Sequence, residues 1–516
     1  MRLIHLPLLL LLSGLSPVSA AGPPLAVAVD QLFGPEDPDY FSGELLVARN
    51  GKPLVHKTAG MAEFADSVPL LPDSVFQLAS AAKPFTSVAI LQLRDQGRLK
   101  LDDPVAQHLP GFPYPKITIR HLLTHTSGLP DLELFEPMVA ADPQHVVSGK
   151  DLVPALSTWQ KPVRFLPGEQ FRYSNINYQL LAQLVSVVTG RPFGDYVRER
   201  IFRPAGMRSS YVLGSRALGP QRAPVANHVH AVMYRTRPED VRHLDYPDKR
   251  MMRPYRYEGF NLGSTVGDQN LFSTVDDLML FDRALRSGKI LSLGSQEEAY
   301  APVRLNNGSE YTEPAVYDLY ASICSYGMGW EVCRHPTRGR LVGHAGFNRG
   351  IQTMLYRELD SGVFAAMYDN GDTSDFSKKL AGSISTVHGD KSPVLPRQRS
   401  TAREYGAALL AEGPTAAMIL FNRLRAEPTA WITTKEGMNR LGYDLLRNGH
   451  QAAALEPFRI NILLYPDDAN LYDSLAEALA ANDRKPEAIL AYKRSLELKP
   501  DNEKGRAALK ALEISN

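Results

Sequence analysis

Strand patterns occur at two widely separated places in this chain of 516 residues, and they restrict its topology more than any other feature. Residues 43–60 hold two apolar-rich runs around Asn50-Gly51, a pair that accepts the positive φ of a tight hairpin turn. Residues 340–346 and 350–370 read as three more strands, the last two joined by a turn. The sequence therefore predicts that the two ends of one domain meet in one antiparallel sheet.

The residues between these strands are mostly helical in pattern. Leu and Val recur at helical spacing over residues 177–189, and Gly190 follows as a stop signal. A similar pattern covers residues 275–285. The predicted fold class is α/β (α+β), with an antiparallel sheet flanked by helices and an all-helical subdomain inserted between the strand groups.

The first twenty residues have the pattern of a signal peptide. Arg2 supplies a short positive start, residues 6–15 are mostly apolar, and residues 18–20 form a small-residue cleavage site. No later stretch is long enough to span a bilayer, so no transmembrane segment is predicted in the mature chain. We expect a signal peptide at 1–20, a main domain at 22–388 and an exported protein, periplasmic or extracellular.

A polar, proline-containing segment at 389–402 reads as a linker, and residues 403–516 are nearly all helix-forming. This tail repeats with a period of 34 residues, which separates Pro466 from Pro500 and matches four further pairs: Leu441 with Leu475, Leu445 with Leu479, Ala454 with Ala488, and Phe458 with Tyr492. The pattern resembles the tetratricopeptide repeat, and a degenerate helical pair at 405–425 precedes it. Such repeats bind a protein partner or extend the packing of the main domain, and the sequence leaves both open.

Composition excludes some functions. Lys and Arg number 57 against 56 Asp and Glu, a formal net charge of +1, which argues against nucleic acid as a main partner.

The only cysteines are Cys324 and Cys333. The segment that joins them reads as one extended strand, too long for a disulfide between its ends, so free buried thiols are preferred.

Ser80 and Lys83 in "LASAAKPF" suggest nucleophilic chemistry. Three residues apart, they share one face of a helix. Pro84 is tolerated only in the first turn of a helix, so Ser80 should lie at a helix N-terminus, where N–H groups favour developing negative charge. A serine nucleophile needs a base in reach, and a lysine with a lowered pKa can serve. A lone S-x-x-K match is nevertheless weak.

Two further motifs strengthen the interpretation of Ser80 and Lys83 as a nucleophile and its base. They are Tyr173-Ser174-Asn175 before a helix, and His344-Ala345-Gly346 on a strand. With these motifs the chain resembles the serine β-lactamase-like hydrolases, closest to the class C β-lactamase, esterase and D-aminopeptidase branch, from about residue 43 to residue 370. Supporting stretches, in order, are "GRLKLDDPVAQHLPGF", "ITIRHLLTHTSGLPD", "FLPGEQFRYSN", "IFRPAGM", "LFSTVDDLMLF" and "YGMGW".

The resemblance implies roles for particular residues. Ser80 would be the acylated nucleophile, Lys83 its base or electrostatic partner, and Tyr173 the general base in acylation. The oxyanion hole would be the backbone N–H groups of Ser80 and Phe347. The remaining residues would contact substrate: Asn175, His344, Ala345 and Gly346. No metal or cofactor is implied.

The chain departs from many penicillin-binding relatives at His344, where they carry Lys followed by Thr or Ser. Imidazole is mostly neutral at pH 7 and Ala345 brings no hydroxyl, so binding of a substrate carboxylate is weakened. We therefore expect hydrolysis of esters or of small amides and peptides. Two alternatives stay open: a β-lactamase or D-Ala-D-Ala carboxypeptidase, and a non-catalytic platform that works through the repeats.

Three other stretches contain residue types that could form a site. A Ser-His-Asp triad within residues 121–131 is disfavoured, because the chain has no G-x-S-x-G elbow and the resembling family has a structural turn here. Histidines within 227–243 lack the spacing of a metal site. The Arg- and Tyr-rich segment 222–257 reads as a solvated insertion, with recognition of an acidic or aromatic substrate group as the alternative.

Overall fold

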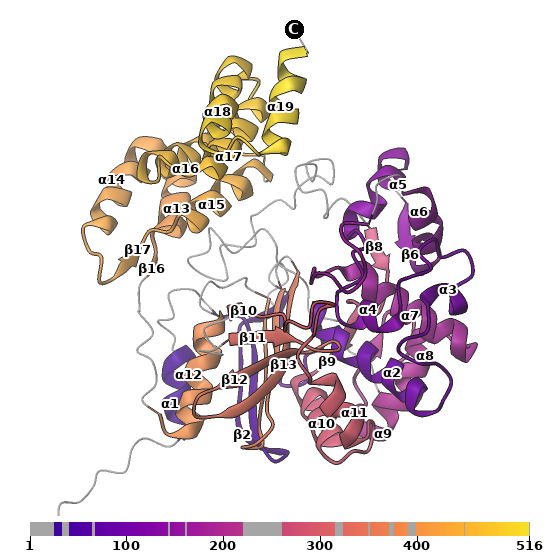
Figure 1. The fold of residues 1–516 in the computed structure, drawn as a ribbon. Coiled ribbons are helices and arrows are strands. Elements are labelled where there is room, and N and C mark those ends of the chain that lie inside the picture. Colours follow the sequence, from indigo (N-terminus) through magenta and orange to yellow (C-terminus); the bar gives the residue numbers. More distant parts are fainter. Residues whose placement is uncertain are drawn as a thin grey trace, which may run out of the picture.

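Figure 1 shows the computed structural model of the chain. It describes residues 25–33, 41–63, 68–142, 145–159, 163–219, 261–314, 323–348, 351–370, 376–390, 399–447 and 449–514. The predicted signal peptide at 1–20 and the segment 222–257 lie outside the described residues, as does most of the predicted linker. Among the described helices, none is both long enough and apolar enough to cross a bilayer.

An eight-stranded antiparallel sheet forms the centre of the main domain, in the order β10-β11-β12-β13-β14-β15-β1-β2. Its strands are β1 Gly43–Arg49, β2 Lys52–Ala59, β10 Glu313–Pro314, β11 Ile323–Tyr326, β12 Glu331–His335, β13 Gly339–Asn348, β14 Ile351–Glu358 and β15 Val363–Asp369. The first strand pairs with the last, so both ends of the domain meet in one sheet. The predicted topology is confirmed.

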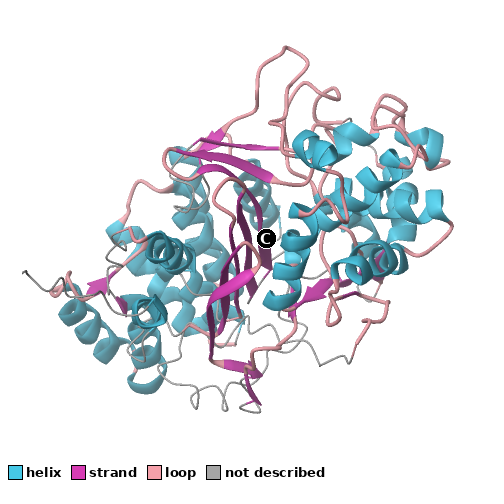
Figure 2. Ribbon diagram, turned by 90° about the horizontal axis from the view of Figure 1, so that it is seen from below, coloured by secondary structure: helices cyan, strands magenta, loops and turns pink. Residues whose placement is uncertain are grey.

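Side chains alternate between the two faces of the sheet, as the two-residue period of a strand requires. In β1, Leu45 and Val47 pack on the face covered by α1 Leu25–Asp30 and α12 Phe376–His388. Leu46 and Ala48 pack into the larger core on the opposite face. Figure 2 shows the strands between helices on both sides, which explains why this sheet is apolar on both faces.

The larger core is mainly helical, as predicted for the middle of the chain. Its helices are α2 Lys83–Asp95, α3 Val105–His108, α4 Ile119–Leu123, α5 Glu136–Ala141, α6 Leu152–Thr158, α7 Asn175–Thr189, α8 Phe193–Val197, α9 Arg203–Ala205, α10 Val275–Arg286 and α11 Leu293–Ala299. Short helical turns are η1 Gln31–Phe33, η2 Ala79–Ala82, η3 Leu132–Phe135, η4 Gly149–Asp151 and η5 Arg198–Phe202. Short strands are β3 Met61–Glu63, β4 Val68–Pro69, β5 Phe76–Gln77, β6 Val146–Ser148, β7 Tyr211–Val212, β8 Asn261–Ser264 and β9 Leu271–Ser273.

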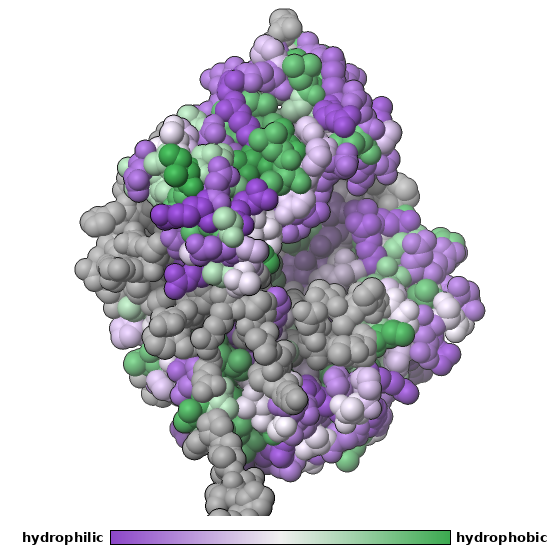
Figure 3. All heavy atoms as spheres, turned by 90° about the vertical axis from the view of Figure 1, so that its left-hand side faces the viewer, coloured by the Kyte–Doolittle hydropathy of each residue, from purple (hydrophilic) through white to green (hydrophobic). Residues whose placement is uncertain are grey.

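The C-terminal region is all-helical apart from β16 Arg399–Ser400 and β17 Trp431–Ile432. Its helices are α13 Thr401–Glu412, α14 Pro414–Arg425, α15 Lys435–Arg447, α16 Gln451–Leu464, α17 Ala469–Ala481, α18 Lys485–Leu498 and α19 Glu503–Ile514. The eight residues matched at the 34-residue offset are all buried in one core. In Figure 3 these helices, at the top, show apolar patches among hydrophilic side chains. The repeat assignment and the domain boundaries at 388 and 402 stay predictions.

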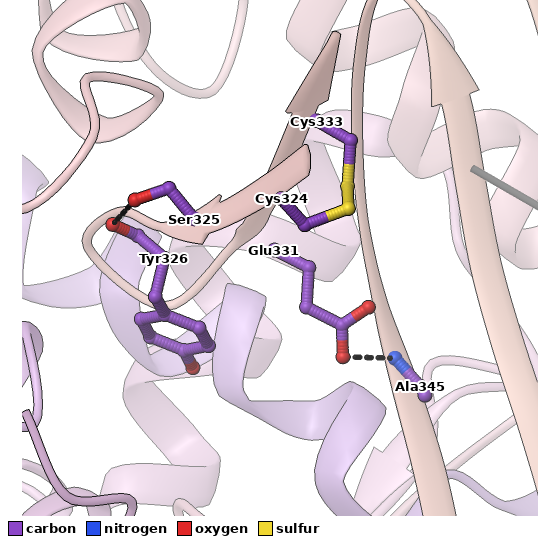
Figure 4. Close-up of a disulfide and its surroundings, with 6 residues drawn as sticks. All are labelled: Cys324, Ser325, Tyr326, Glu331, Cys333 and Ala345. Atoms are coloured by element: carbon purple, nitrogen blue, oxygen red, sulfur yellow. Dashed lines mark hydrogen bonds between the residues drawn. A yellow bond between two sulfur atoms is a disulfide. The ribbon is translucent and has the colours of Figure 1, made fainter. Parts of the chain in front are cut away.

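The preference for free thiols is wrong, because Cys324 and Cys333 form a disulfide. They face each other across β11 and β12, with Cα atoms 4.2 Å apart. The segment between them is a hairpin rather than one strand, since Gly329 adopts a φ of +83° and Gly327 N–H donates to the Trp330 carbonyl over 2.8 Å. Figure 4 shows the bridged hairpin. The two glycines of "YGMGW" were the signal for this turn.

Candidate active site

Ser80 lies in η2, the turn that leads directly into α2. Pro84 occupies the first turn of α2, where its missing N–H costs no hydrogen bond, as predicted. The residue before Ser80, Ala79, has a φ of +47°, a strained conformation for a non-glycine residue. Such strain is typical of residues that a surrounding structure holds in a special position. The Ser80 side chain is half-buried and reaches its neighbours from this turn.

Lys83 is fully buried at the start of α2. Its Nζ lies 3.0 Å from Ser80 Oγ, 2.9 Å from Asn175 Oδ1 and 3.3 Å from the Asp268 carbonyl oxygen. Burial lowers the pKa of Lys83 to about 8, although the Asp268 and Asp131 carboxylates oppose this change. A lysine with this pKa is partly a neutral amine near pH 8, and the neutral amine is a base.

Tyr173 lies across from Lys83, whose Nζ is 4.7 Å from the centre of the phenol ring. Burial raises the pKa of Tyr173 well above its ordinary value, while a hydrogen bond with the Ser80 side chain lowers it. The carboxylates of Glu331 and Asp131 raise the same pKa. Tyr173 therefore keeps its proton at neutral pH.

Asn175 begins α7 and connects Lys83 to Asp131. Its backbone N–H donates to Asp131 Oδ1 over 2.8 Å, and its side-chain amide donates to Asp131 Oδ2 over 3.4 Å. This amide orientation leaves Asn175 Oδ1 as the acceptor for Lys83. Burial raises the pKa of Asp131 to about 6.

The turn at residues 125–131 holds this motif in place and forms no catalytic triad. His125 has a φ of +55°, and its Nδ1 accepts from Ser174 N–H over 3.2 Å. The Asn177 amide also donates to this nitrogen, over 3.0 Å. Ser127 donates to Asn177 Oδ1 over 2.7 Å instead of bonding to a histidine. The predicted structural turn is the better description of this stretch.

His344, on β13, is 2 % exposed, and both of its ring nitrogens have partners. Nδ1 donates to the Ala345 carbonyl over 2.6 Å, and Nε2 accepts from the Tyr326 hydroxyl over 2.9 Å. Burial, together with the Lys83 charge, lowers the pKa of His344 to about 3. The imidazole is therefore neutral, and it has no nitrogen left over for a substrate carboxylate.

Gly346 brings β13 against the turn that carries Ser80. A Cβ at this position would overlap the Leu78 carbonyl and the Thr353 hydroxyl, and it would lie 3.1 Å from Ala81 N. Thr353 itself donates to the Leu78 carbonyl over 2.7 Å. Phe347 follows directly and is 58 % exposed. Glycine at 346 thus permits a contact between strand and helix start that no other residue allows.

Four side chains of this site were missed by sequence reasoning. Asp268 is buried near Lys83 and accepts from the Gln179 amide over 3.2 Å. Tyr178 donates to the Leu123 carbonyl over 2.7 Å, with its ring 5.7 Å from Lys83 Nζ. Tyr326 and Glu331 come from the bridged hairpin. Only "YGMGW" marked any of these positions in advance.

The comparisons with known proteins agree with this geometry. Residues 34–385, more than half of the chain, match the family described as Beta-lactamase. This chain belongs to the β-lactamase family of serine hydrolases. The resemblance noted from the three motifs, the fold class and the assignment as a hydrolase are thereby confirmed.

Among curated relatives, penicillin-binding protein 4* of Bacillus subtilis is 36% identical over 320 residues, which are 62% of this chain and 66% of that protein. Protein flp of Staphylococcus aureus is 28% identical over 324 residues, which are 55% of this chain and 63% of that protein. The chain thus spans somewhat less than two thirds of the length of either relative.

Two solved structures share the fold. D-amino acid amidase from Ochrobactrum anthropi, complexed with L-phenylalanine amide, gives a TM-score of 0.56 at 24% identity and covers 71% of this chain and 99% of its own. The octameric penicillin-binding protein homologue from Pyrococcus abyssi gives 0.53 at 21% identity and covers 75% of this chain and 80% of its own.

Proposed function

We propose that this chain hydrolyses esters or small amides and peptides through an acyl-enzyme formed on Ser80. The observation that carries the proposal is the 3.0 Å contact between Lys83 Nζ and Ser80 Oγ, with a lysine whose pKa is lowered to about 8. A nucleophile and a base in hydrogen-bond reach are the first requirement of nucleophilic catalysis. Relatives that carry penicillin-binding or amidase in their names support acyl transfer as the reaction class.

In this proposal Lys83, rather than Tyr173, accepts the proton of Ser80. As a neutral amine, Lys83 has two N–H donors and one lone pair. The donors satisfy Asn175 Oδ1 and the Asp268 carbonyl, and the lone pair accepts the Ser80 hydroxyl proton. This assignment differs from the role that the family resemblance implied for Tyr173, because the raised pKa of Tyr173 leaves almost no phenolate to act as a base.

Tyr173 then serves as the proton donor to the leaving group. As the bond from Ser80 Oγ to the carbonyl carbon forms, the bond to the leaving group breaks, and the leaving group takes the proton of the Tyr173 hydroxyl. The Lys83 ammonium, whose Nζ lies 4.7 Å from the ring centre, stabilises the phenolate until the phenolate takes the proton of the attacking water and Lys83 returns its own proton to Ser80 Oγ. Water hydrolyses the acyl-enzyme by the same groups in reverse order.

The backbone N–H groups of Ser80 and Phe347 are the proposed oxyanion hole. Pairing between β13 and β14 matches Asn348 with Ile351 at the hairpin end, so Asn348 and Gly346 direct their N–H groups toward β14. Phe347, with the opposite parity, directs its N–H away from β14. The close approach of Gly346 to η2 brings this N–H toward the turn of Ser80.

Substrates without a carboxylate beside the scissile bond suit this site best. His344 is neutral and fully hydrogen-bonded, and Ala345 offers no hydroxyl, so the groups that hold a carboxylate in penicillin-binding relatives are missing. Slow or absent β-lactam hydrolysis follows. Turnover of nitrocefin at the rate of a dedicated β-lactamase would instead favour the β-lactamase or D-Ala-D-Ala carboxypeptidase alternative.

An exported location, periplasmic or extracellular, is part of the proposal. The disulfide between Cys324 and Cys333 supports it, since such bonds persist in oxidising compartments. The predicted tetratricopeptide-like repeats are proposed to add stacked helical hairpins, because the matched positions share one buried core. A protein partner for them stays a prediction.

The test is active-site labelling with a fluorophosphonate, followed by intact-mass spectrometry and p-nitrophenyl acetate hydrolysis. We expect a single adduct on Ser80, and we expect Ser80→Ala to abolish both the adduct and the hydrolysis. Full ester hydrolysis by Ser80→Ala would refute the mechanism. A wild-type protein that takes no label and hydrolyses no ester would favour the non-catalytic platform.

A further inference from the structure

One face of β13 points at the active site, and Asn348 is the last residue of that strand. Side chains alternate along a strand, so residues 344, 346 and 348 share one face. His344 lies in the site on this face, and Gly346 permits the close contact with the turn of Ser80. Asn348 continues the same face directly after Phe347, whose N–H belongs to the proposed oxyanion hole.

The Asn348 side chain is hydrogen-bonded to two other segments of the site. Its Nδ2 donates to Gln77 Oε1 over 2.9 Å and to Gln269 Oε1 over 3.3 Å. Gln77 is the last residue of β5 and precedes the turn that carries Ser80. Gln269 directly follows the residue whose carbonyl accepts from Lys83. One side chain thus connects the strand of the oxyanion hole to the segments that hold the nucleophile and its base.

A chain of hydrogen bonds determines which way the Asn348 amide faces. The Thr265 carbonyl can only accept, so its 2.7 Å contact must come from Asn270 Nδ2. Asn270 Oδ1 therefore accepts from Gln77 Nε2 over 2.6 Å, and Gln77 Oε1 is left to accept from Asn348. Asn348 is consequently a donor to both glutamines, a role that an ionised carboxylate of the same shape cannot fill.

The segments that meet at this amide cluster have little regular pairing with each other. β5 pairs with β9 over Phe76 and Gln77 alone, and β13 ends one residue after Phe347. Ala79 and Asn270 have φ values of +47° and +58°, which are uncommon for residues other than glycine. Such conformations persist where surrounding contacts enforce them. The amide cluster supplies contacts of this kind at the point where β13 meets the turn of the nucleophile.

We propose that Asn348 is a positioning residue of the oxyanion hole. Its two donated hydrogen bonds hold the end of β13 so that the Phe347 N–H reaches the oxygen that becomes negative when Ser80 attacks. In this role Asn348 acts through the Phe347 N–H and not through contact with the substrate. The inference rests on the proposed function, since it assumes acyl transfer to Ser80.

The test compares p-nitrophenyl acetate hydrolysis with inhibition by phenylboronic acid. Ser80 Oγ forms a bond to boron and gives its proton to Lys83, no other bond breaks, and an oxygen of the anionic boronate occupies the hole. Acylation and deacylation both pass through an oxyanion, so a weaker hole lowers kcat and leaves KM unchanged. We expect Asn348→Ala to lower kcat about thirtyfold, to change KM less than about twofold, and to raise the Ki of phenylboronic acid about thirtyfold.

Two further variants make the test independent of the alanine substitution. Asn348→Asp keeps the shape but sets a carboxylate against two carbonyl oxygens, so its loss of kcat should be at least as large. Gln77→Ala removes the shorter contact from the other side and should lower kcat about tenfold. The double variant Gln77→Ala/Asn348→Ala should lose no more than Asn348→Ala alone, because the contact is already absent.

Thermal unfolding shows whether each variant folds, and Asn307→Ala is the matched control. Asn307 is an exposed asparagine of a turn, where its Oδ1 accepts from Ser309 N–H over 2.9 Å. This substitution also removes an asparagine side chain and one of its hydrogen bonds. We expect it to change neither kcat nor the Ki of phenylboronic acid.

Unchanged kcat in folded Asn348→Ala or Gln77→Ala would overturn the inference, as would losses that multiply in the double variant. A fall in kcat without a matching rise in the Ki of phenylboronic acid would assign Asn348 a structural role only. A rise in KM at constant kcat would assign it a contact with substrate instead of positioning. Failure of a fluorophosphonate to label Ser80 in the wild type would contradict the proposed function itself.

Discussion

The pH dependence of catalysis tests the proposed base directly. If the neutral amine of Lys83 takes the Ser80 proton, kcat/KM must rise as Lys83 loses its own proton. With a pKa of about 8, the neutral fraction grows from about 1% at pH 6 to about 50% at pH 8. The expected rise in kcat/KM is therefore about fiftyfold between these values, with a plateau above pH 9.

The pH profile of kcat/KM that Lys83 predicts differs from the profiles that His344 and Tyr173 would give. Burial lowers the pKa of His344 to about 3, so this ring contributes no inflection above pH 5. Tyr173 titrates far above the plateau, because its pKa is raised well above the ordinary value. Asp268→Asn removes a negative charge that stabilises the Lys83 ammonium, so the rising limb should move to lower pH by about one unit.

The assay is p-nitrophenyl acetate hydrolysis between pH 5.5 and 9.5, corrected with Ser80→Ala for the spontaneous reaction. Lys83→Arg is the matched control, because it keeps a cation that cannot lose its proton, and we expect a loss of about a thousandfold at every pH. A flat profile in the wild type, or an Arg variant with more than about a tenth of the activity, would refute a base role for Lys83.

Three further perturbations test the structure around the site. Gly346→Ala should reduce kcat/KM at least about a hundredfold and lower stability by about 1–3 kcal/mol in thermal unfolding, because the new methyl group displaces β13 from the turn of Ser80. Replacing Cys324 and Cys333 together with serine should cost about 2–3 kcal/mol of unfolding free energy, and a reducing agent should then have no further effect on denaturant unfolding. Burial raises the pKa of Glu44 from 4.5 to about 7, so its protonated form contributes stability that is complete below pH 4.5 and is lost as the pH rises through 7. Glu44→Gln should therefore remove this pH dependence, so that it stabilises the protein more at pH 8 than at pH 4 while it also alters the 2.6 Å hydrogen bond with His56 Nε2, as followed by denaturant titration.

Local signals predicted much of the fold. Asn50 and Gly51 turn the first hairpin with φ values of +52° and +73°, and Gly190 ends α7 in the left-handed conformation with a φ of +69°. At each of these positions the positive φ follows from the residue type alone, so it can be predicted without knowing the tertiary contacts. The meeting of the N- and C-terminal strands followed from the pattern of strands, since a half-formed sheet leaves edges to be paired.

The hairpin between the cysteines was not predicted, for a physical reason. Apolar and aromatic residues on both sides of "YGMGW" gave a continuous strand pattern, and glycine within such a pattern also fits a bulge. Asp268 and Glu331 were missed for a different reason. Their roles depend on which backbone groups lie beside them, and strand register and loop packing decide this over long distances in sequence.

The three motifs differ in how much chemistry their residue types determine. Ser80 and Lys83 contact each other because of helical spacing, which the sequence contains. The charge of His344 depends on burial and on Tyr326, which the sequence does not place. A lysine at that position would need a carboxylate partner to remain charged when so deeply buried, and Glu331 lies 3.9 Å away. A neutral histidine at this depth needs no such partner, and for this reason the proposed site disfavours substrates with a carboxylate beside the scissile bond.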